Sequence, residues 1–250
     1  EGYVKEYIKL DFPSTVGGDF AGKVINIGEN SGDFKVGDEV YGQAAVFAGG
    51  TGAFAEVLAA NVGKIAIRPK NVDFLEAASL PLVGESALQA LETHIKLKAG
   101  QKILIHGGAG GIGTIAIQLA KTLRAYVATT VSGYDVEYVR GLGADEAIDY
   151  ETQVFEDKLK DFDAVLDNVG EDITDKSFKV LKKGGIIVSM TGAPSAQLAE
   201  KYGVVAIGQN TEGNGERLRH LSQLVESGKI KPQVDRVFSL DEAKEAFTHL

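Results

Sequence analysis

The sequence of 250 residues contains no cysteine, which excludes disulfide bonds, thiolate catalysis and zinc held by cysteine ligands. Histidine is scarce as well, and the few histidines show no spacing of the HxxxH kind that a metal site would need. They are His94, His106, His220 and His249. We therefore expect no metal site.

Long apolar runs and clustered positive charge are also missing. No stretch approaches the ~18 apolar residues of a membrane-spanning helix, and no basic, apolar signal segment opens the chain. We therefore expect a cytoplasmic protein with no membrane partner. The formal net charge is −9 and no basic stripe is present, which argues against a nucleic acid partner.

Glycine, by contrast, is abundant, and its most informative cluster follows an apolar run. Residues 103–121 read ILIHGGAGGIGTIAIQLAK, the pattern of a buried strand, a glycine-rich turn and an amphipathic helix. Such a turn lets the backbone approach a ligand closely, and the helix directs its first N–H groups at an anion. Gly108, Gly110 and Gly113 therefore match the dinucleotide-binding fingerprint in its proper context. The alternative is a glycine turn with a purely structural role.

The remaining patterns predict two kinds of structure. Residues 1 to about 70 contain short β-like runs with glycine turns, typical of an irregular β domain, at 22–28, 37–42, 52–59 and 63–69. A helix capped by Asp73 follows, Pro81 interrupts it, and Ser86–Thr93 continues it. From about 101 to 210 strands and helices alternate, which predicts a parallel sheet covered by helices on both faces.

The expected elements of this alternating region are as follows. Strands are predicted at 102–106, 126–131, 146–149, 164–167, 186–190 and 204–207. Helices are predicted near 113–123, 134–142, 151–160, 172–182 and 194–202. The tail is predicted to form a helix at 215–227, a strand at 235–238 and a helix capped by Asp241.

Taken together, nine segments resemble, in the family's order, the zinc-independent quinone oxidoreductase branch of the medium-chain dehydrogenase/reductase superfamily. They are GGDFAG at 17–22, VGDEVYG at 36–42, GAFAE at 52–56, AASLPLVGESALQAL at 77–91, HGGAGGIG at 106–113, LGADEAIDY at 142–150, DAVLDNVG at 163–170, LKKGGIIVSM at 181–190 and VFSLDEAKEA at 237–246. The resemblance implies an α/β fold with a Rossmann doubly wound parallel sheet plus a partial GroES-like β domain. It assigns 1–80, with 231–250 returning, to the GroES-like substrate domain and 81–230 to the Rossmann dinucleotide-binding domain.

The resemblance also implies a gap at each end. Family members usually begin with roughly fifty further residues and end with one further strand, and a missing strand would leave unpaired sheet edges. We therefore expect that the sequence is a fragment or an incomplete record. Family members are dimers, and the strand Gly185–Met190, near the sheet edge, is expected to pair across a homodimer. The alternative is that this apolar strand lies in the core.

The resemblance implies hydride transfer without a metal. Asp19 stands near the position where zinc-dependent relatives have a histidine–glutamate pair. Without a Lewis acid, hydride donation from NADPH to an electron-poor small molecule, a quinone or an α,β-unsaturated carbonyl, is favoured over alcohol oxidation. The alternative is a catalytically weak NADPH-binding protein, such as a crystallin-like protein or a component of a larger assembly.

Several positions are placed around the cofactor by resemblance. Ser86 matches the family's threonine or serine beside the nicotinamide, but it also fits a helix N-cap. Glu85 replaces a residue that is usually apolar, and its carboxylate either alters substrate preference or faces solvent. The residues expected to bind the cofactor are Ser86, Gly108, Gly110, Gly111, Ile112, Gly113, Thr130, Ser132, Tyr150, Asn168, Val169, Gly170, Met190 and Thr191. For the residues that end strands, the alternative is that they only connect the strand to the following loop.

The preference for NADPH over NADH rests on the end of the second strand of the sheet. Thr130 falls where an NAD site would show a carboxylate, and with Ser132 it leaves room for a 2′-phosphate. Tyr150 matches a family tyrosine near that phosphate. However, the lysine that many relatives carry is replaced by Asp135, and Arg140 faces away in the expected helix.

The proton donor is the least determined residue. Family members use a tyrosine near the start of this chain, and Tyr3 is the nearest candidate, with an exposed terminal aromatic residue as its alternative. Tyr41 is expected to pack in the core, and His106, within an apolar strand, is expected to be structural. Solvent then remains as a source of the proton.

Overall fold

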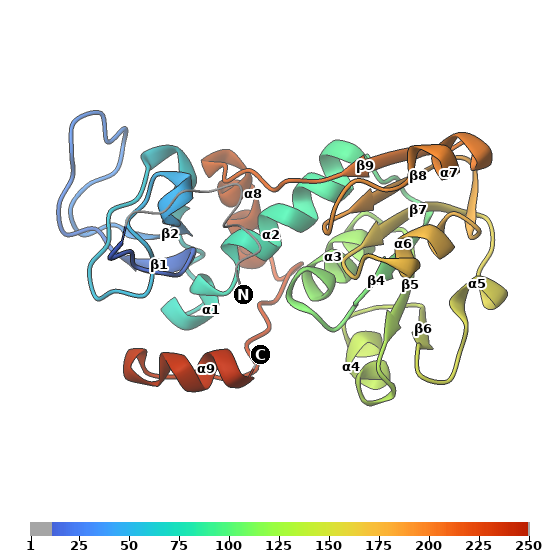
Figure 1. Cartoon of the computed structure of the whole chain (residues 1–250). Helices are drawn as coiled ribbons and strands as arrows, with labels where there is room; N and C mark the ends of the chain where they lie inside the picture. Colours follow the sequence, from blue (N-terminus) through green and yellow to red (C-terminus); the bar gives the residue numbers. More distant parts are fainter. Residues whose placement is uncertain (1–11, 250) are drawn as a thin grey trace. The chain divides into compact units, whose positions relative to one another are not determined.

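The computed structural model describes residues 12–249, which divide into two compact units (Figure 1). The first unit contains the described residues up to Glu85 together with Gly213–Glu226 and the chain from Pro232 onwards. The second unit contains Ser86–Glu212 and Ser227–Lys231. Within residues 12–249, no helix has both the length and the apolar character needed to cross a membrane.

The second unit is built on a parallel sheet of six strands. The strands are β4 (Lys102–His106), β5 (Tyr126–Val131), β6 (Glu146–Asp149), β7 (Phe162–Asp167), β8 (Leu181–Ser189) and β9 (Val205–Gly208). Their order in the sheet is β6-β5-β4-β7-β8-β9, so the chain winds outward from β4 in both directions. This order is that of a doubly wound dinucleotide-binding sheet, and it confirms the predicted Rossmann fold.

Helices and short helical turns connect these strands. They are η3 (Gln89–His94), α3 (Gly111–Thr122), η4 (Gly133–Asp135), α4 (Val136–Gly141), α5 (Phe155–Lys158), α6 (Asp172–Ser177) and α7 (Ala196–Tyr202). In α3 the apolar residues Ile115, Ala116, Leu119 and Ala120 fall on one face and are buried, so packing fixes this helix beside β4 and β5.

The core of the second unit continues on the sheet. Leu104, Val165 and Ile187 come from three adjacent strands and are fully buried, with Phe162 and Phe178 packed in the same cluster. Apolar strands of this kind, covered on both faces, are what a parallel sheet requires.

The helix predicted near 172–182 ends earlier, at Ser177. Phe178, Val180 and Leu181 are buried, and Leu181 already pairs with Phe162 at the start of β8. Burial of these side chains in the sheet unit therefore outweighs a further helical turn.

The strand expected near the sheet edge is the last strand but one of the sheet. β8 pairs with β7 on one side and with β9 on the other, so Gly185–Met190 has no free side for pairing with a second copy within the described sheet, and its alternative as a core strand holds. The edge strand on this side is β9.

The first unit contains a small antiparallel sheet. Its strands β1 (Asp19–Lys23), β2 (Glu39–Gln43) and β3 (Ile65–Ile67) pair in the order β1-β2-β3. The helical elements that accompany it are η1 (Val46–Ala48), η2 (Val62–Lys64), α1 (Phe74–Ala78), α8 (Gly215–Glu226), η5 (Leu240–Glu242) and α9 (Ala243–His249). Helix α2 (Pro81–Leu88) begins in this unit and continues past Glu85 into the second.

Capping explains where helices of the first unit begin. Asp73 caps α1 as predicted, and it forms a capping box with Glu76. At the end of the chain, however, Ser239 and Glu242 form the capping box, so the prediction that Asp241 caps the last helix is wrong.

Two predicted strands of the first unit are absent from the structure. Residues 52–59 form bends, held by hydrogen bonds from the Ala53 and Phe54 N–H groups to the carbonyls of Gly17 and Val16. Residues 235–238 pair with no strand among residues 12–249; there, Asp235 bonds His249 and Arg236 stacks on Phe238. A residue pattern that alternates predicts a strand only where a partner strand is present.

Candidate functional site

The predicted site residues gather at one edge of the second unit. Tyr3 lies outside the described residues, and the other predicted residues all belong to the second unit. The glycine loop follows β4, Asn168 follows β7, and β4 and β7 are the neighbours at which the direction of winding reverses. Ligands bind at this switch point, beside the carboxyl ends of the strands, in open α/β sheets.

The glycine loop cannot carry side chains at two of its positions. A Cβ on Gly108 would lie 2.0 Å from the Thr129 hydroxyl oxygen, and a Cβ on Gly113 would lie 2.2 Å from the Gly107 carbonyl oxygen. Gly107 itself has a φ of +68°, in the left-handed region that favours glycine. The sequence therefore needs these glycines to bring α3 close to the strand.

Helix α3 begins without a side-chain cap. Its N-cap residue is Gly110, which offers no side-chain acceptor to the first N–H groups of the helix. These N–H groups belong to Gly111, Ile112 and Gly113, which open the helix. With the positive end of the helix dipole, they form a cradle that fits the pyrophosphate of a dinucleotide.

Asn168 lies across the switch point from this loop. Its side-chain amide donates to the His106 carbonyl at 2.8 Å, while its Oδ1 is buried with no hydrogen-bond partner in the described part of the chain. A buried acceptor without a partner costs free energy unless a ligand or water pairs with it. Asn168 therefore offers a hydrogen bond at the place where the cofactor is expected.

Asp167 holds the loop after β7 and was missed by the sequence reasoning. Its carboxylate is fully buried and accepts hydrogen bonds from the N–H groups of Val169 and Gly170, at 2.9 and 3.0 Å, and from the Thr174 hydroxyl. The only signal in the sequence was a carboxylate at the end of an apolar strand. After β8, Met190 is half-buried and Thr191 is exposed at the same edge.

His106 is a structural residue, as expected. Its Nδ1 and Nε2 lie 2.9 Å from the hydroxyl oxygens of Thr130 and Ser177, and its ring meets the edge of Phe155. Burial lowers the pKa of His106 below its usual value, despite the opposing charge of Asp167. The bond to His106 also leaves the Thr130 hydroxyl buried behind the glycine loop.

Ser86 lies in the interior of α2, so the alternative that it caps a helix is wrong. Its hydroxyl is 2.7 Å from that of Thr211, and the Gln209 amide donates to the Ser86 carbonyl at 3.1 Å. Gln209 Oε1 is buried, with no hydrogen-bond partner from Phe12 to His249. The sequence reasoning missed Gln209 and Thr211, because neither belongs to a recognisable motif.

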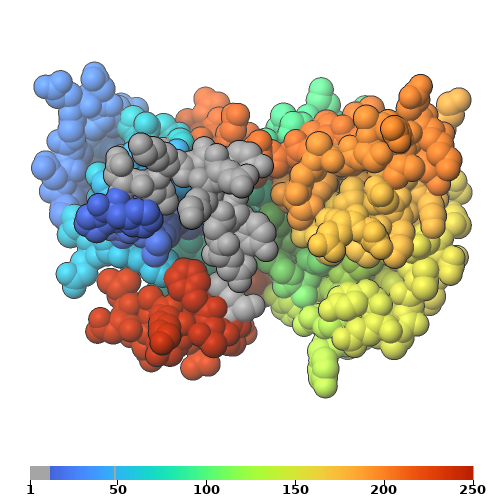
Figure 2. Space-filling view, in the orientation of Figure 1, coloured from blue at the N-terminus to red at the C-terminus, as the bar shows by residue number. Residues whose placement is uncertain are grey.

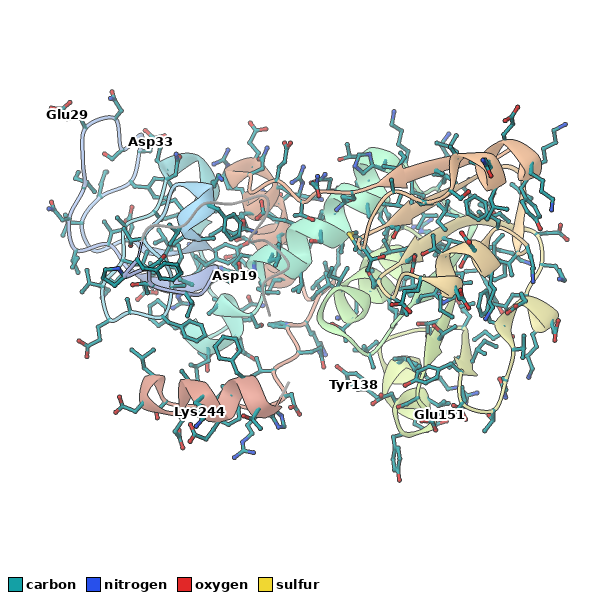
Figure 3. The ribbon with its side chains drawn as sticks, viewed as in Figure 1. Asp19, Glu29, Asp33, Tyr138, Glu151 and Lys244 are labelled. Atoms are coloured by element: carbon teal, nitrogen blue, oxygen red, sulfur yellow. The ribbon has the colours of Figure 1, made fainter. Side chains whose placement is uncertain are left out.

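Glu85 is fully buried in the first unit, so the alternative that it faces solvent is wrong. One oxygen accepts the Asn214 N–H, and the other has no hydrogen-bond partner within the residues that the structure describes. Burial raises the pKa of Glu85 to about 7, and it raises the pKa of Asp19 to about 6 although Asp19 accepts the Leu82 N–H at 2.9 Å (Figure 3 labels Asp19).

Comparison with known proteins shows which family this chain belongs to. A model described as "Alcohol dehydrogenase GroES-like domain" matches residues 2–70, and one described as "Zinc-binding dehydrogenase" matches residues 142–250. The chloroplastic quinone-oxidoreductase QR1 of Triphysaria versicolor is 33% identical over 262 residues, which cover 98% of this chain and 79% of that protein. This chain belongs to the quinone oxidoreductase branch of the medium-chain dehydrogenase/reductase superfamily.

Two further relatives are longer than this chain. It is 40% identical to the 2-methylene-furan-3-one reductase of Solanum lycopersicum and 39% identical to the chloroplastic NADPH-dependent alkenal/one oxidoreductase of Arabidopsis thaliana. Each match covers 246 residues, 95% of this chain and 61% of the relative. The chain thus spans less than two thirds of the length of these proteins.

Solved structures of the quinone oxidoreductase family share the fold. The quinone oxidoreductase from Coxiella burnetii has a TM-score of 0.89 and 35% identity, covering 99% of this chain and 79% of that one. The Escherichia coli quinone oxidoreductase complexed with NADPH has a TM-score of 0.84 and 27% identity, covering 98% and 82%. One matching model is described as zinc-binding, yet this family member has no cysteine, and residues 12–249 contain no cluster of histidine and carboxylate side chains suited to a metal ion.

Proposed function

We propose that this protein is an NADPH-dependent oxidoreductase that reduces a quinone or an α,β-unsaturated carbonyl compound. The observation that carries the proposal is the uncapped N-terminus of α3 at the switch point of the sheet, directly after the glycine loop. The names of the relatives support the same reaction class, since they include a quinone oxidoreductase and an NADPH-dependent alkenal/one oxidoreductase.

Three parts of the cofactor would lie along this edge of the second unit. The pyrophosphate would lie on the N–H groups that open α3, next to Gly108, Gly110, Gly111, Ile112 and Gly113. The nicotinamide end would lie near Ser86, Asn168, Val169, Gly170, Met190 and Thr191. The adenosine ribose would lie at the ends of β5 and β6, near Thr130, Ser132 and Tyr150. We also propose that 1–80 with 231–250 forms the GroES-like substrate domain and 81–230 the Rossmann domain.

NADPH, when bound, supplies the hydride, and the residues of this chain bind and orient the cofactor. The first N–H groups of α3 neutralise part of the pyrophosphate charge without a competing side-chain cap. Asp167 fixes the backbone of residues 168–170 through its two N–H contacts, so the Asn168 side chain meets the cofactor in one orientation. The proton that completes the reduction would come from solvent or from Tyr3, which lies outside the described residues.

The test uses the full-length protein with NADPH and NADH and a panel of benzoquinone, phenanthrenequinone and a medium-chain alkenal. We expect oxidation of NADPH in the presence of at least one acceptor, measured by loss of reduced-nicotinamide absorbance. Cofactor binding without turnover on any acceptor would support the catalytically weak binding protein instead. If neither cofactor binds, the glycine loop is not a nucleotide site and the proposal is wrong.

Location and assembly are further parts of the proposal. We propose a cytoplasmic homodimer that pairs through β9, one of the two edge strands of the six-stranded sheet, on which Val205 is 53% exposed. Fractionation of cells that express the full-length protein tests the location, which is chloroplastic in two of the relatives. Light scattering after size exclusion tests the dimer.

A further inference from the structure

The end of β5 is the place where a dinucleotide site distinguishes NADPH from NADH. The strand ends at Val131, and Ser132 leads into the turn η4, which ends at Asp135. The Ser132 hydroxyl donates to the Asp135 carboxylate at 2.8 Å. The hydroxyl that was expected to leave room for a 2′-phosphate is therefore already donating, and it holds a carboxylate at this edge.

A second carboxylate lies against the same turn. Asp149 ends β6, and its two oxygens accept the Glu151 N–H at 3.0 Å and the Thr152 hydroxyl at 2.7 Å. A Cβ built on Gly133 would lie 3.2 Å from Asp149 Oδ2, so the turn approaches this carboxylate closely. Asp135 and Asp149 thus belong to neighbouring strand ends around one glycine.

Positive charge does not balance these groups. Residues 132–140 and 149–152 carry four carboxylates, at Asp135, Glu137, Asp149 and Glu151, and one cation, Arg140. Arg140 is bound to Glu137 at 2.7 Å. Within residues 12–249, neither Asp135 nor Asp149 takes part in an ion pair with a lysine or arginine.

This part of the second unit is open to solvent. Residues 133–152 contribute yellow-green surface in Figure 2, and Tyr134 and Tyr150 are 98% and 61% exposed. Figure 3 shows Tyr138 of α4 and Glu151 after β6 at the same end of the unit. A nucleotide ribose could reach this edge from solvent, and the charges that it meets there are negative.

We propose that Asp135 is a specificity-determining residue, which opposes a 2′-phosphate so that the chain binds NADH and NADPH within about tenfold of each other. The inference rests on the proposed function and extends its cofactor range to NADH. A 2′-phosphate carries nearly two negative charges, and a carboxylate within a few ångströms repels it. The same carboxylate is a suitable acceptor for the free 2′-hydroxyl of NADH, the role that acidic residues have at this strand end.

The test measures binding of adenosine 2′,5′-bisphosphate and of adenosine 5′-monophosphate by calorimetry, using the full-length protein without substrate. In the wild type we expect affinities for the two nucleotides within about tenfold. Asp135→Lys is expected to strengthen binding of the bisphosphate by about tenfold or more and to weaken binding of the monophosphate slightly, because the acceptor for its 2′-hydroxyl is lost. Asp135→Asn should give a smaller change in the same direction.

Glu200→Lys is the matched control, because it makes the same charge change on α7, in the connection between β8 and β9 at the opposite side of the sheet. Circular dichroism checks that each variant folds. A wild type that prefers the bisphosphate by more than a hundredfold would overturn the inference, as would an Asp135→Lys protein that behaves like Glu200→Lys. If neither nucleotide binds, the failure lies at the glycine loop and therefore in the proposed function.

Discussion

The Asn168 side-chain amide donates a hydrogen bond to the His106 backbone carbonyl at 2.8 Å. This bond joins the loop after β7 to the strand end that precedes the glycine loop, directly at the switch point. It orients the side chain so that Oδ1, which has no partner among residues 12–249, is left for a ligand or water. The two sides of the proposed cofactor site are therefore tied together by one side chain.

Replacement of this side chain should weaken cofactor binding more than it weakens the fold. Asn168→Ala removes the bond to His106 and the acceptor, and we expect about a tenfold loss in NADPH affinity with a loss of about 1 kcal/mol in stability. Fluorescence titration and thermal unfolding measure the two effects. Affinity equal to the wild type would remove Asn168 from the site.

The uncapped start of α3 predicts a charge-specific effect at Gly110. Gly110→Asp and Gly110→Ser both supply a good N-cap, so both should fold. Only aspartate places a negative charge where the pyrophosphate is proposed to lie, and we expect it to weaken NADPH binding by at least about a hundredfold, well beyond serine. Equal affinities for the two variants would show that no anion binds at this helix end.

Asp167 should support the loop rather than contact the cofactor. Asp167→Asn keeps the size of the side chain but replaces one acceptor oxygen with an NH2 group. This donor would face the N–H or hydroxyl groups that donate to Asp167 in the wild type. We expect a loss of about 2 to 3 kcal/mol in unfolding free energy. Asp172→Asn, at an exposed position on α6, is the control. A fully stable Asp167→Asn protein would argue against this role.

Glu85 and Asp19 predict that stability falls as pH rises. Burial raises the pKa of Glu85 to about 7 and that of Asp19 to about 6, above the values of carboxyls in an unfolded chain. The folded protein therefore keeps these protons to higher pH, so their contribution is complete below about pH 4 and is lost as the pH rises through about 6 to 7.

Glu85→Gln removes one of these titrations. Relative to wild type, the unfolding free energy of this variant should be about 2 kcal/mol more favourable to the folded state at about pH 8 than at about pH 5. Thermal unfolding at both pH values measures the difference. Glu29→Gln, an exposed position of the first unit labelled in Figure 3, serves as the control. The same pH dependence in Glu85→Gln and wild type would contradict the prediction.

The sheet of the second unit was predictable because its strands are short apolar runs between glycines and helices. Strands β4, β5 and β6 have the predicted bounds, and the glycine loop lies where its motif required. The partners of individual side chains were not predictable. Ser86 bonds Thr211, 125 positions away, and Thr130 bonds His106, because only the folded chain brings these hydroxyls to their partners.

The first unit was harder to predict for a related reason. Residues 52–59 and 235–238 have β-like composition, but composition does not specify whether a neighbouring strand is available. The burial of Glu85 could not be predicted either. A carboxylate in a helix usually faces solvent, and the contact that Glu85 makes with Asn214, in the loop before α8, exists only in the folded chain.

His106 lies directly before the glycine loop, and its two ring nitrogens are both occupied by hydroxyl partners. A histidine that gained a proton between about pH 5 and 8 would add a positive charge next to the proposed pyrophosphate and make binding stronger in acid. Because burial keeps this ring neutral, acidification of the compartment would not tighten the protein's hold on its nucleotide through His106.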